Sequence, residues 1–167
     1  TVRVPVTWYN HMNYANNSID EKWMERVVEV VNYVIDNDMI CIVNVHHDIG
    51  ADGWLRASTK DYEKKQKRFT AIWTQIAETF KDYGDNLLFE SFNEILDDNN
   101  EWTTPGAEAL TVVNEYNQLF VNTVRASGGN NESRCLVVNT YAAAANSAVT
   151  RDFVLPEDTI EDRLIVE

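Results

Sequence analysis

The most informative segment of this sequence reads Leu87-Leu88-Phe89-Glu90-Ser91-Phe92-Asn93-Glu94-Ile95-Leu96. Its first residues form a short apolar run, which is typical of a buried parallel strand. The run leads into Asn93-Glu94, so the strand is expected to deliver a carboxylate at its C-terminal end. Burying an ionised carboxylate without partners is costly, and Glu94 is therefore expected to be hydrogen-bonded, shifted in pKa or exposed in a cleft. The alternative is that Glu94 only caps the next helix or pairs with an arginine.

The same alternation of strand and helix repeats along the chain. Besides the segment above, strand-like runs lie at residues 2–7, 39–45, 134–140 and 163–167. Apolar residues at helical spacing predict helices at about residues 21–37, 62–83 and 107–126, and a weaker helical segment at 141–145. Strands that alternate with amphipathic helices predict an α/β fold with a parallel sheet and right-handed crossovers.

Two architectures satisfy this pattern. A doubly wound sheet that holds a dinucleotide usually has a glycine-rich turn after its first strand, but the sequence there is Trp8-Tyr9-Asn10-His11. A (β/α)₈ barrel places its chemistry at the C-terminal ends of its strands, where this sequence has its unusual residues. A whole barrel takes about 250 residues, so 167 residues predict a partial TIM barrel.

Composition narrows the possible partners. The chain is 44% hydrophobic, which suits one domain with a core of its own, and its formal net charge is −13. Nucleic acid and anionic membranes are therefore disfavoured, and the basic run at residues 60–68 reads as the exposed face of a helix. No run is long enough to cross a bilayer and no signal peptide is seen. The strand-like start at residues 1–6 suggests a cut or processed N-terminus.

Cys41 and Cys135 lie in separate strand-like runs. If the strands follow chain order, the strand of Phe89 separates them, and they are too far apart for a disulfide. Two buried, free thiols are expected.

Several other side chains lie next to predicted strand ends. Arg3, on the first strand, is either a carboxylate partner inside the barrel or an exposed terminal residue. His46 and His47 follow a buried strand, and only one of two successive side chains can point straight into a site. A metal site at His46-His47-Asp48 is disfavoured, because adjacent residues chelate poorly and no second ligand cluster is visible.

Two tryptophans lie in the loops after the second and third strands, Trp54 and Trp102. Each either forms a stacking platform for a sugar ring at the mouth of a cleft or folds over its own loop.

Several ordered motifs together resemble glycoside hydrolase family 5, the cellulase or endo-β-1,4-glucanase family, across essentially the whole chain. They are Val2-Arg3-Val4-Pro5-Val6-Thr7-Trp8, Asn44-Val45-His46-His47-Asp48, Gly53-Trp54-Leu55, Phe89-Glu90-Ser91-Phe92-Asn93-Glu94 and Leu136-Val137-Val138-Asn139-Thr140-Tyr141.

The resemblance implies a (β/α)₈ barrel with two catalytic glutamates, at the ends of strands four and seven. Glu94 would be the acid/base and Asn93 would contact the sugar 2-hydroxyl. Arg3 would support the nucleophile, and His46 and His47 would line the substrate site. No cofactor or metal is implied, and the parent protein would be secreted or lie at the cell surface.

The chain departs from the family in length. The nucleophile would lie beyond Glu167, so residues 1–167 would form a single partial catalytic domain covering roughly strands two to six. Glu90 lies on the same strand as Glu94, about 13 Å away, and is not a convincing nucleophile. Two hypotheses remain. The chain is either a fragment of a retaining, endo-acting β-glucan hydrolase, inactive alone and cleaving β-1,4-glucosidic bonds when the barrel is complete, or an inactive half-barrel that self-associates or binds carbohydrate without turnover.

Overall fold

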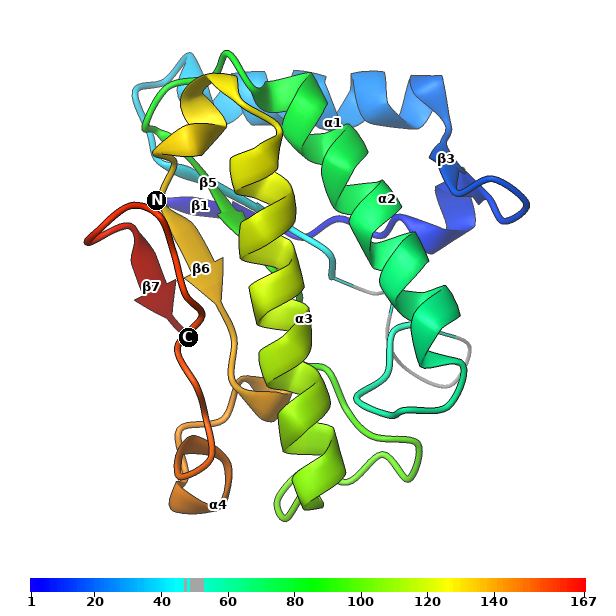
Figure 1. Ribbon diagram of the computed structural model, residues 1–167. Helices are drawn as coiled ribbons and strands as arrows, with labels where there is room; N and C mark the ends of the chain where they lie inside the picture. Colours follow the sequence, from blue (N-terminus) through cyan, green and yellow to red (C-terminus); the bar gives the residue numbers. More distant parts are fainter. Residues whose placement is uncertain (47, 49–52) are drawn as a thin grey trace.

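The computed structural model describes residues 1–46, 48 and 53–167 as an α/β fold built on one parallel sheet (Figure 1). The five strands of this sheet lie in the order β1-β4-β5-β6-β7. Their bounds are β1 Val2–Val4, β4 Cys41–Asn44, β5 Leu87–Glu90, β6 Leu136–Val138 and β7 Leu164–Val166. Each described pair of neighbours is parallel, as predicted.

Helices connect these strands. They are α1 Glu21–Ile35, α2 Tyr62–Phe80, α3 Ala107–Ala126 and the short α4 Ser147–Thr150, with 3₁₀ turns η1 Tyr9–His11, η2 Gly129–Glu132 and η3 Tyr141–Ala143. The three long helices begin where the sequence predicts. The weak segment at 141–145 is a 3₁₀ turn followed by α4, because Ala142 and Ala143 both have positive φ.

Two local features differ from the sequence expectation. The first strand ends at Val4 rather than Thr7, because Pro5 has no N–H to continue the ladder. The polar loop after it contains an antiparallel pair that was not predicted, β2 Met12–Asn13 and β3 Ser18–Ile19. This hairpin docks on α2, where Gln75 accepts a hydrogen bond from the Ile19 N–H at 2.8 Å.

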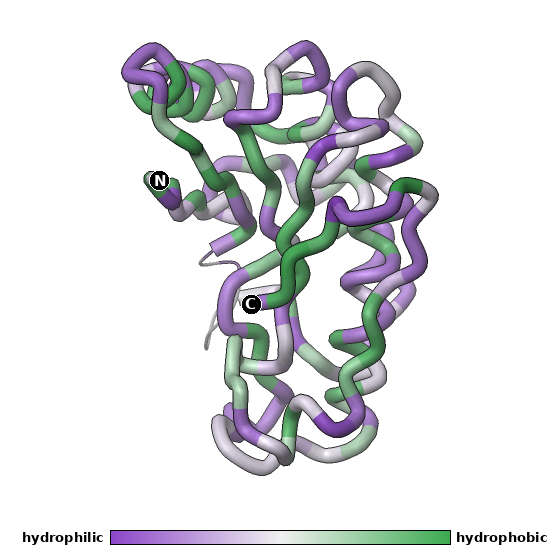
Figure 2. The backbone as a smooth tube through the Cα atoms, turned by 90° about the vertical axis from the view of Figure 1, so that its left-hand side faces the viewer, coloured by the Kyte–Doolittle hydropathy of each residue, from purple (hydrophilic) through white to green (hydrophobic). Residues whose placement is uncertain are grey.

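The two faces of the sheet have different chemistry. On the helix side, Phe89 packs against Trp73 of α2 with ring centroids 5.6 Å apart, and Trp73 in turn lies 4.5 Å from Phe120 of α3. Successive side chains of a strand point to opposite faces, so Glu90 must point away from the helices. Figure 2 shows the hydrophobic strands running through the middle of the molecule and hydrophilic loops at its periphery.

The sheet is curved. Strands β1 and β7 lie at opposite edges of the sheet, yet the charge of Glu167, next to β7, contributes to raising the pKa of Arg3 on β1. The strands also turn relative to one another across the sheet, from β1 to the steeply inclined β6 and β7 (Figure 1). The curvature is that of a partial barrel. Among the described residues, no helix is long and apolar enough to span a membrane.

Cys41 and Cys135 are both free, and β5 lies between their strands as predicted. Cys41 is buried, also as predicted. The expectation that Cys135 is buried is wrong. It is half-exposed because it precedes β6, and its sulfur accepts a hydrogen bond from Arg163 at 3.6 Å.

Candidate active site

A buried ion pair lies on the inner face of the sheet. Glu90, the last residue of β5, is fully buried and accepts two hydrogen bonds from Arg3 of β1, from Nε at 2.6 Å and from Nη2 at 2.5 Å. This contact raises the pKa of the Arg3 guanidinium, and the nearby charges of Glu94 and Glu167 act in the same direction. Arg3 is thus a carboxylate partner, as one of the two alternatives held, but the carboxylate that it pairs with is Glu90, and Glu94 contributes only at longer range.

Asn44 extends this pair toward β4. Its Nδ2 group donates to Glu90 Oε1 at 3.0 Å and lies 3.1 Å from Nδ1 of His46. The backbone N–H of His46 donates to the Val6 carbonyl at 2.8 Å, which anchors the residue beyond the strand end. Asn44 and His46 are two residues apart, so their side chains are expected on the same face of the strand. Because Asn44 contacts Glu90, His46 lies on the same face of the sheet as Glu90.

Asn93 and Glu94 lie in the segment that leaves β5. Asn93 is 7% exposed; its backbone N–H donates to Val45 O at 2.9 Å, and its Oδ1 accepts from Arg3 Nη2 at 2.9 Å. Glu94 is exposed and makes no hydrogen bond to any residue that the structure describes. The strand thus delivers an accessible carboxylate beside an amide whose orientation is fixed.

Trp54 is held by its own loop. Its indole N–H donates to Asp48 Oδ2 at 2.9 Å, and Asp48 Oδ1 accepts from the backbone N–H groups of Trp8 and Tyr9. Burial raises the pKa of Asp48, although these hydrogen bonds lower it. Asp48 therefore clamps the loops after β1 and β4 together, and Trp54 is part of that clamp.

Trp102 is 51% exposed in the loop before α3. The residue before it, Glu101, is held in place because its carbonyl accepts a hydrogen bond from the Tyr141 hydroxyl at 2.5 Å. No described contact brings Trp102 to Glu94 or Asn93.

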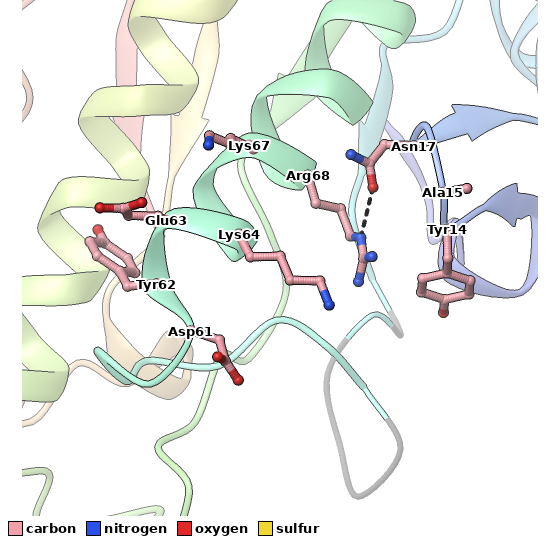
Figure 3. Close-up of a pocket in the computed structure, with 9 residues that line it drawn as sticks. All are labelled: Tyr14, Ala15, Asn17, Asp61, Tyr62, Glu63, Lys64, Lys67 and Arg68. Carbon is pink, nitrogen blue, oxygen red and sulfur yellow. Dashed lines mark hydrogen bonds between the residues drawn. The ribbon is translucent and has the colours of Figure 1, made fainter.

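A separate pocket of about 540 Å³ lies where the β2–β3 hairpin meets the start of α2 (Figure 3). Arg68 is buried at its wall and donates to Asn17 at 3.0 Å. The Arg68 guanidinium lies 4.5 Å from the ring of Tyr14 and 5.5 Å from that of Trp54. The predicted site residues that the structure describes do not line this pocket. Arg68 belongs to the basic run at residues 60–68 and is buried, so that run forms part of a pocket wall and is not only an exposed helix face.

The structure thus brings together Arg3, His46, Asn93 and Glu94 and leaves both tryptophans outside their hydrogen-bond network. His47 lies outside the described residues. In the part of the chain that the structure describes, no group of three or more His, Cys, Asp or Glu side chains is arranged to hold a metal ion.

Sequence reasoning missed Asn44 and gave Glu90 no role. The sequence did contain one signal for Asn44: it lies two residues before His46 at the end of the same strand, so the two side chains lie on one face. The register that pairs Asn44 with Glu90 cannot be read from either strand alone.

A parallel sheet with helices on one side, and with carboxylate, amide and imidazole groups gathered beyond its strand ends, is the arrangement of a β/α-barrel protein, a class that carries its functional site at the C-terminal strand ends. The chain belongs to the cellulase family, glycosyl hydrolase family 5, whose model matches residues 1–167.

Individual relatives agree with this assignment. Endoglucanase B of Clostridium cellulovorans is 43% identical over 169 residues, covering 99% of this chain and 37% of the relative. The xyloglucan-specific endo-β-1,4-glucanase of Bacteroides ovatus is 37% identical over 169 residues, covering 99% and 33%. The chain therefore spans about a third to two fifths of these two relatives.

Solved structures show the same fold. A family 5 enzyme of Prevotella bryantii superposes with a TM-score of 0.95 at 47% identity, covering 98% of this chain and 48% of that one. A variant of it was solved with a xyloglucan tetradecasaccharide. A broad-specificity endoglucanase of Ruminococcus champanellensis, solved with cellotriose, gives a TM-score of 0.92 at 52% identity and covers 98% and 47%. The sheet is thus about half of a barrel of this family.

Proposed function

We propose that the chain is the acid/base half of a retaining endo-β-1,4-glucanase. The observation that carries this proposal is the Asn93-Glu94 pair beyond β5, in which Arg3 fixes the amide while the carboxylate stays accessible. The relatives' names and the bound oligosaccharides of the neighbouring structures support a β-glucan substrate.

In this proposal Glu94 first protonates the leaving glycosidic oxygen and then, as a carboxylate, activates the water that releases the sugar. Asn93 Nδ2 donates to the sugar hydroxyl next to the scissile bond, because Oδ1 is already engaged by Arg3. His46, whose Nδ1 lies 3.1 Å from Asn44 Nδ2, lies beyond the neighbouring strand end and contributes to substrate binding.

Retaining hydrolysis also requires a nucleophilic carboxylate about 5–5.5 Å from the acid. Glu90 does not meet this need, since both of its oxygens are engaged in hydrogen bonds from Arg3 and Asn44 and it is fully buried. We assign the nucleophile to the part of the barrel that the relatives have and this chain does not cover. Residues 1–167 then form one partial catalytic domain of an exported or cell-surface protein.

The second candidate is a half-barrel that binds carbohydrate without turnover. It is favoured by the same missing carboxylate and by the exposure of Trp102, which offers a stacking surface. A protein that contains this chain and retains β-glucan without cleaving it would support this candidate.

The test uses the protein with a complete barrel and the substitution Glu94→Gln. We expect kcat/KM on an unactivated β-glucan oligosaccharide to fall about 10²–10⁴-fold, the usual contribution of a general acid. On an aryl cellobioside with an activated phenol leaving group, kcat/KM should fall far less, because that group departs without protonation.

Two further variants complete the experiment. Asn93→Ala should lower kcat/KM for both substrates alike, since it removes a contact to the sugar itself. Glu78→Gln, at an exposed glutamate of α2, is the matched control and should change neither. An equal loss on both substrates with Glu94→Gln would mean that Glu94 is not the acid.

A further inference from the structure

A single buried carboxylate connects the two sides of the candidate site. The Glu90 network, as we call it, consists of Glu90, Arg3, Asn44, His46 and Asn93. Both oxygens of Glu90 are used: Oε2 accepts from Arg3, and Oε1 accepts from Arg3 and from Asn44. Its side chain is fully buried, so water does not replace these contacts.

The carboxylate fixes which way the Asn44 amide points. Side-chain amide oxygen and nitrogen are hard to distinguish by shape, but their hydrogen-bonding roles differ. An ionised carboxylate only accepts, so the group facing Glu90 must be the Asn44 Nδ2 donor. The backbone N–H of Val6, a donor, lies 3.4 Å from Oδ1 and is consistent with this orientation.

The orientation of Asn44 then decides the tautomer of His46. The second hydrogen of Asn44 Nδ2 points to His46 Nδ1 at 3.1 Å. Nδ1 must accept this bond, so in the neutral ring the hydrogen is on Nε2. A proton on Nδ1 would set two donors against each other.

The same carboxylate acts on Asn93 through Arg3. One hydrogen of Arg3 Nη2 goes to Glu90 and the other goes to Asn93 Oδ1 at 2.9 Å. Because Oδ1 is the accepting atom, the Asn93 Nδ2 group is left as a donor.

We propose that Glu90 is a positioning residue: through Asn44 it sets the ring tautomer of His46, and through Arg3 it leaves the Asn93 amide nitrogen as a hydrogen-bond donor, the polarity that suits a sugar hydroxyl oxygen. The catalytic consequence rests on the function proposed above. The tautomer of His46 does not, and can be measured on the chain itself.

Ring ¹⁵N NMR distinguishes a protonated from an unprotonated imidazole nitrogen. In the unaltered chain at a pH where the ring is neutral, we expect Nδ1 of His46 to be unprotonated and Nε2 to carry the hydrogen. The ring signals are assigned with His11→Gln and His47→Gln variants. A His46 ring with its hydrogen on Nδ1 overturns the proposal, and this result requires no substitution in the network.

Glu90→Gln tests the cause. The carboxylate offers two accepting oxygens to three N–H groups, whereas a glutamine side chain offers one oxygen and adds an N–H donor of its own. The Asn44 amide is therefore expected to turn over, so that its Oδ1 accepts from the new side-chain amide at position 90 and from His46.

The hydrogen of His46 should then move to Nδ1. The matched control is Asp158→Asn, which removes the negative charge from a second buried ion pair, between Asp158 and Arg125, and contacts no member of the network. The His46 tautomer should be unchanged in it. A Glu90→Gln chain that folds and keeps the Nε2–H form overturns the proposal, as does a tautomer change in the control.

In the protein with a complete barrel, Glu90→Gln should lower kcat by up to about 100-fold while KM changes little, because misplaced donors lose contacts that strengthen in the transition state. The two proposals fail separately. If His46 has the predicted tautomer but the protein does not cleave β-glucan, the proposed function is refuted and the positioning role of Glu90 is supported. An active β-glucanase whose His46 has Nδ1–H refutes the role of Glu90 alone.

Discussion

The two thiols differ in their environment and should differ in reactivity. Burial raises the pKa of Cys41 from 9.0 to about 11, which lowers the fraction of reactive thiolate near neutral pH about 100-fold. Cys135 is half-exposed at the start of β6. We expect a thiol reagent to modify one cysteine quickly under native conditions, and mass spectrometry after digestion should locate it at Cys135.

Two substitutions serve as controls for this assignment. Cys135→Ser should abolish the fast reaction, and Cys41→Ala should leave it unchanged. Labelling of Cys41 should accelerate as pH rises toward 11, because the thiolate forms there. Rapid modification of Cys41 at neutral pH would contradict its placement on the helix side of β4.

At the level of single residues, the sequence predicted the features that one strand determines and missed those that depend on two. Asn93 and Glu94 stood out because an amide and a carboxylate after an apolar run are unusual wherever the strand lies, and their roles stay predictions. The role of Glu90 could not be predicted in this way, because its partners Arg3 and Asn44 come from two other strands. Their contacts are set by the order of strands in the sheet.

One arginine holds the end of a helix to the sheet. Arg134 is 1% exposed and donates to four backbone carbonyls between the end of α2 and the start of β5. The acceptors are Phe80 O, Tyr83 O, Gly84 O and Leu87 O, at 2.7–3.1 Å. The last carbonyls of a helix lack intrahelical partners, so this guanidinium supplies the cap.

We expect Arg134→Met to lower the free energy of unfolding by about 3–5 kcal/mol, because it leaves buried carbonyls unpaired. Arg134→Lys should recover only part of the loss, since an ammonium has three donors and no planar fork. Urea denaturation measures both. The control Arg151→Lys alters an exposed pair and should change stability by less than about 0.5 kcal/mol. Full recovery by lysine would mean that charge alone matters at this position.

The long helices were predictable because an apolar stripe at helical spacing is a property of the segment itself. The ends of strands and the β2–β3 hairpin were not, because two-residue strands carry too little periodicity to be seen. Asn17 takes a positive φ in this hairpin, and its carbonyl accepts from Gln75 of α2, so the helix stabilises the turn. A contact of this range leaves no trace in the local sequence.

On the scale of the whole molecule, the sheet has an open edge at β7. Among the described strands β7 pairs only with β6, and Ile165 and Val166 are 46% and 48% exposed. An unpaired strand with apolar side chains is a template for another chain. The net charge of −13 opposes such association through repulsion.

We therefore expect residues 1–167, prepared by themselves, to self-associate, and to do so more strongly as salt screens the negative charge. Sedimentation equilibrium should give masses above the 19.2 kDa of one chain, rising with salt. Ile165→Lys with Val166→Lys places two charges on the edge and should restore the monomer at every salt concentration. The control Val154→Lys adds a charge at a valine that is 62% exposed but lies outside the sheet, and it should associate like the unaltered chain. A monomeric chain in high salt, or equal dissociation by the control, would show that the β7 edge does not drive association.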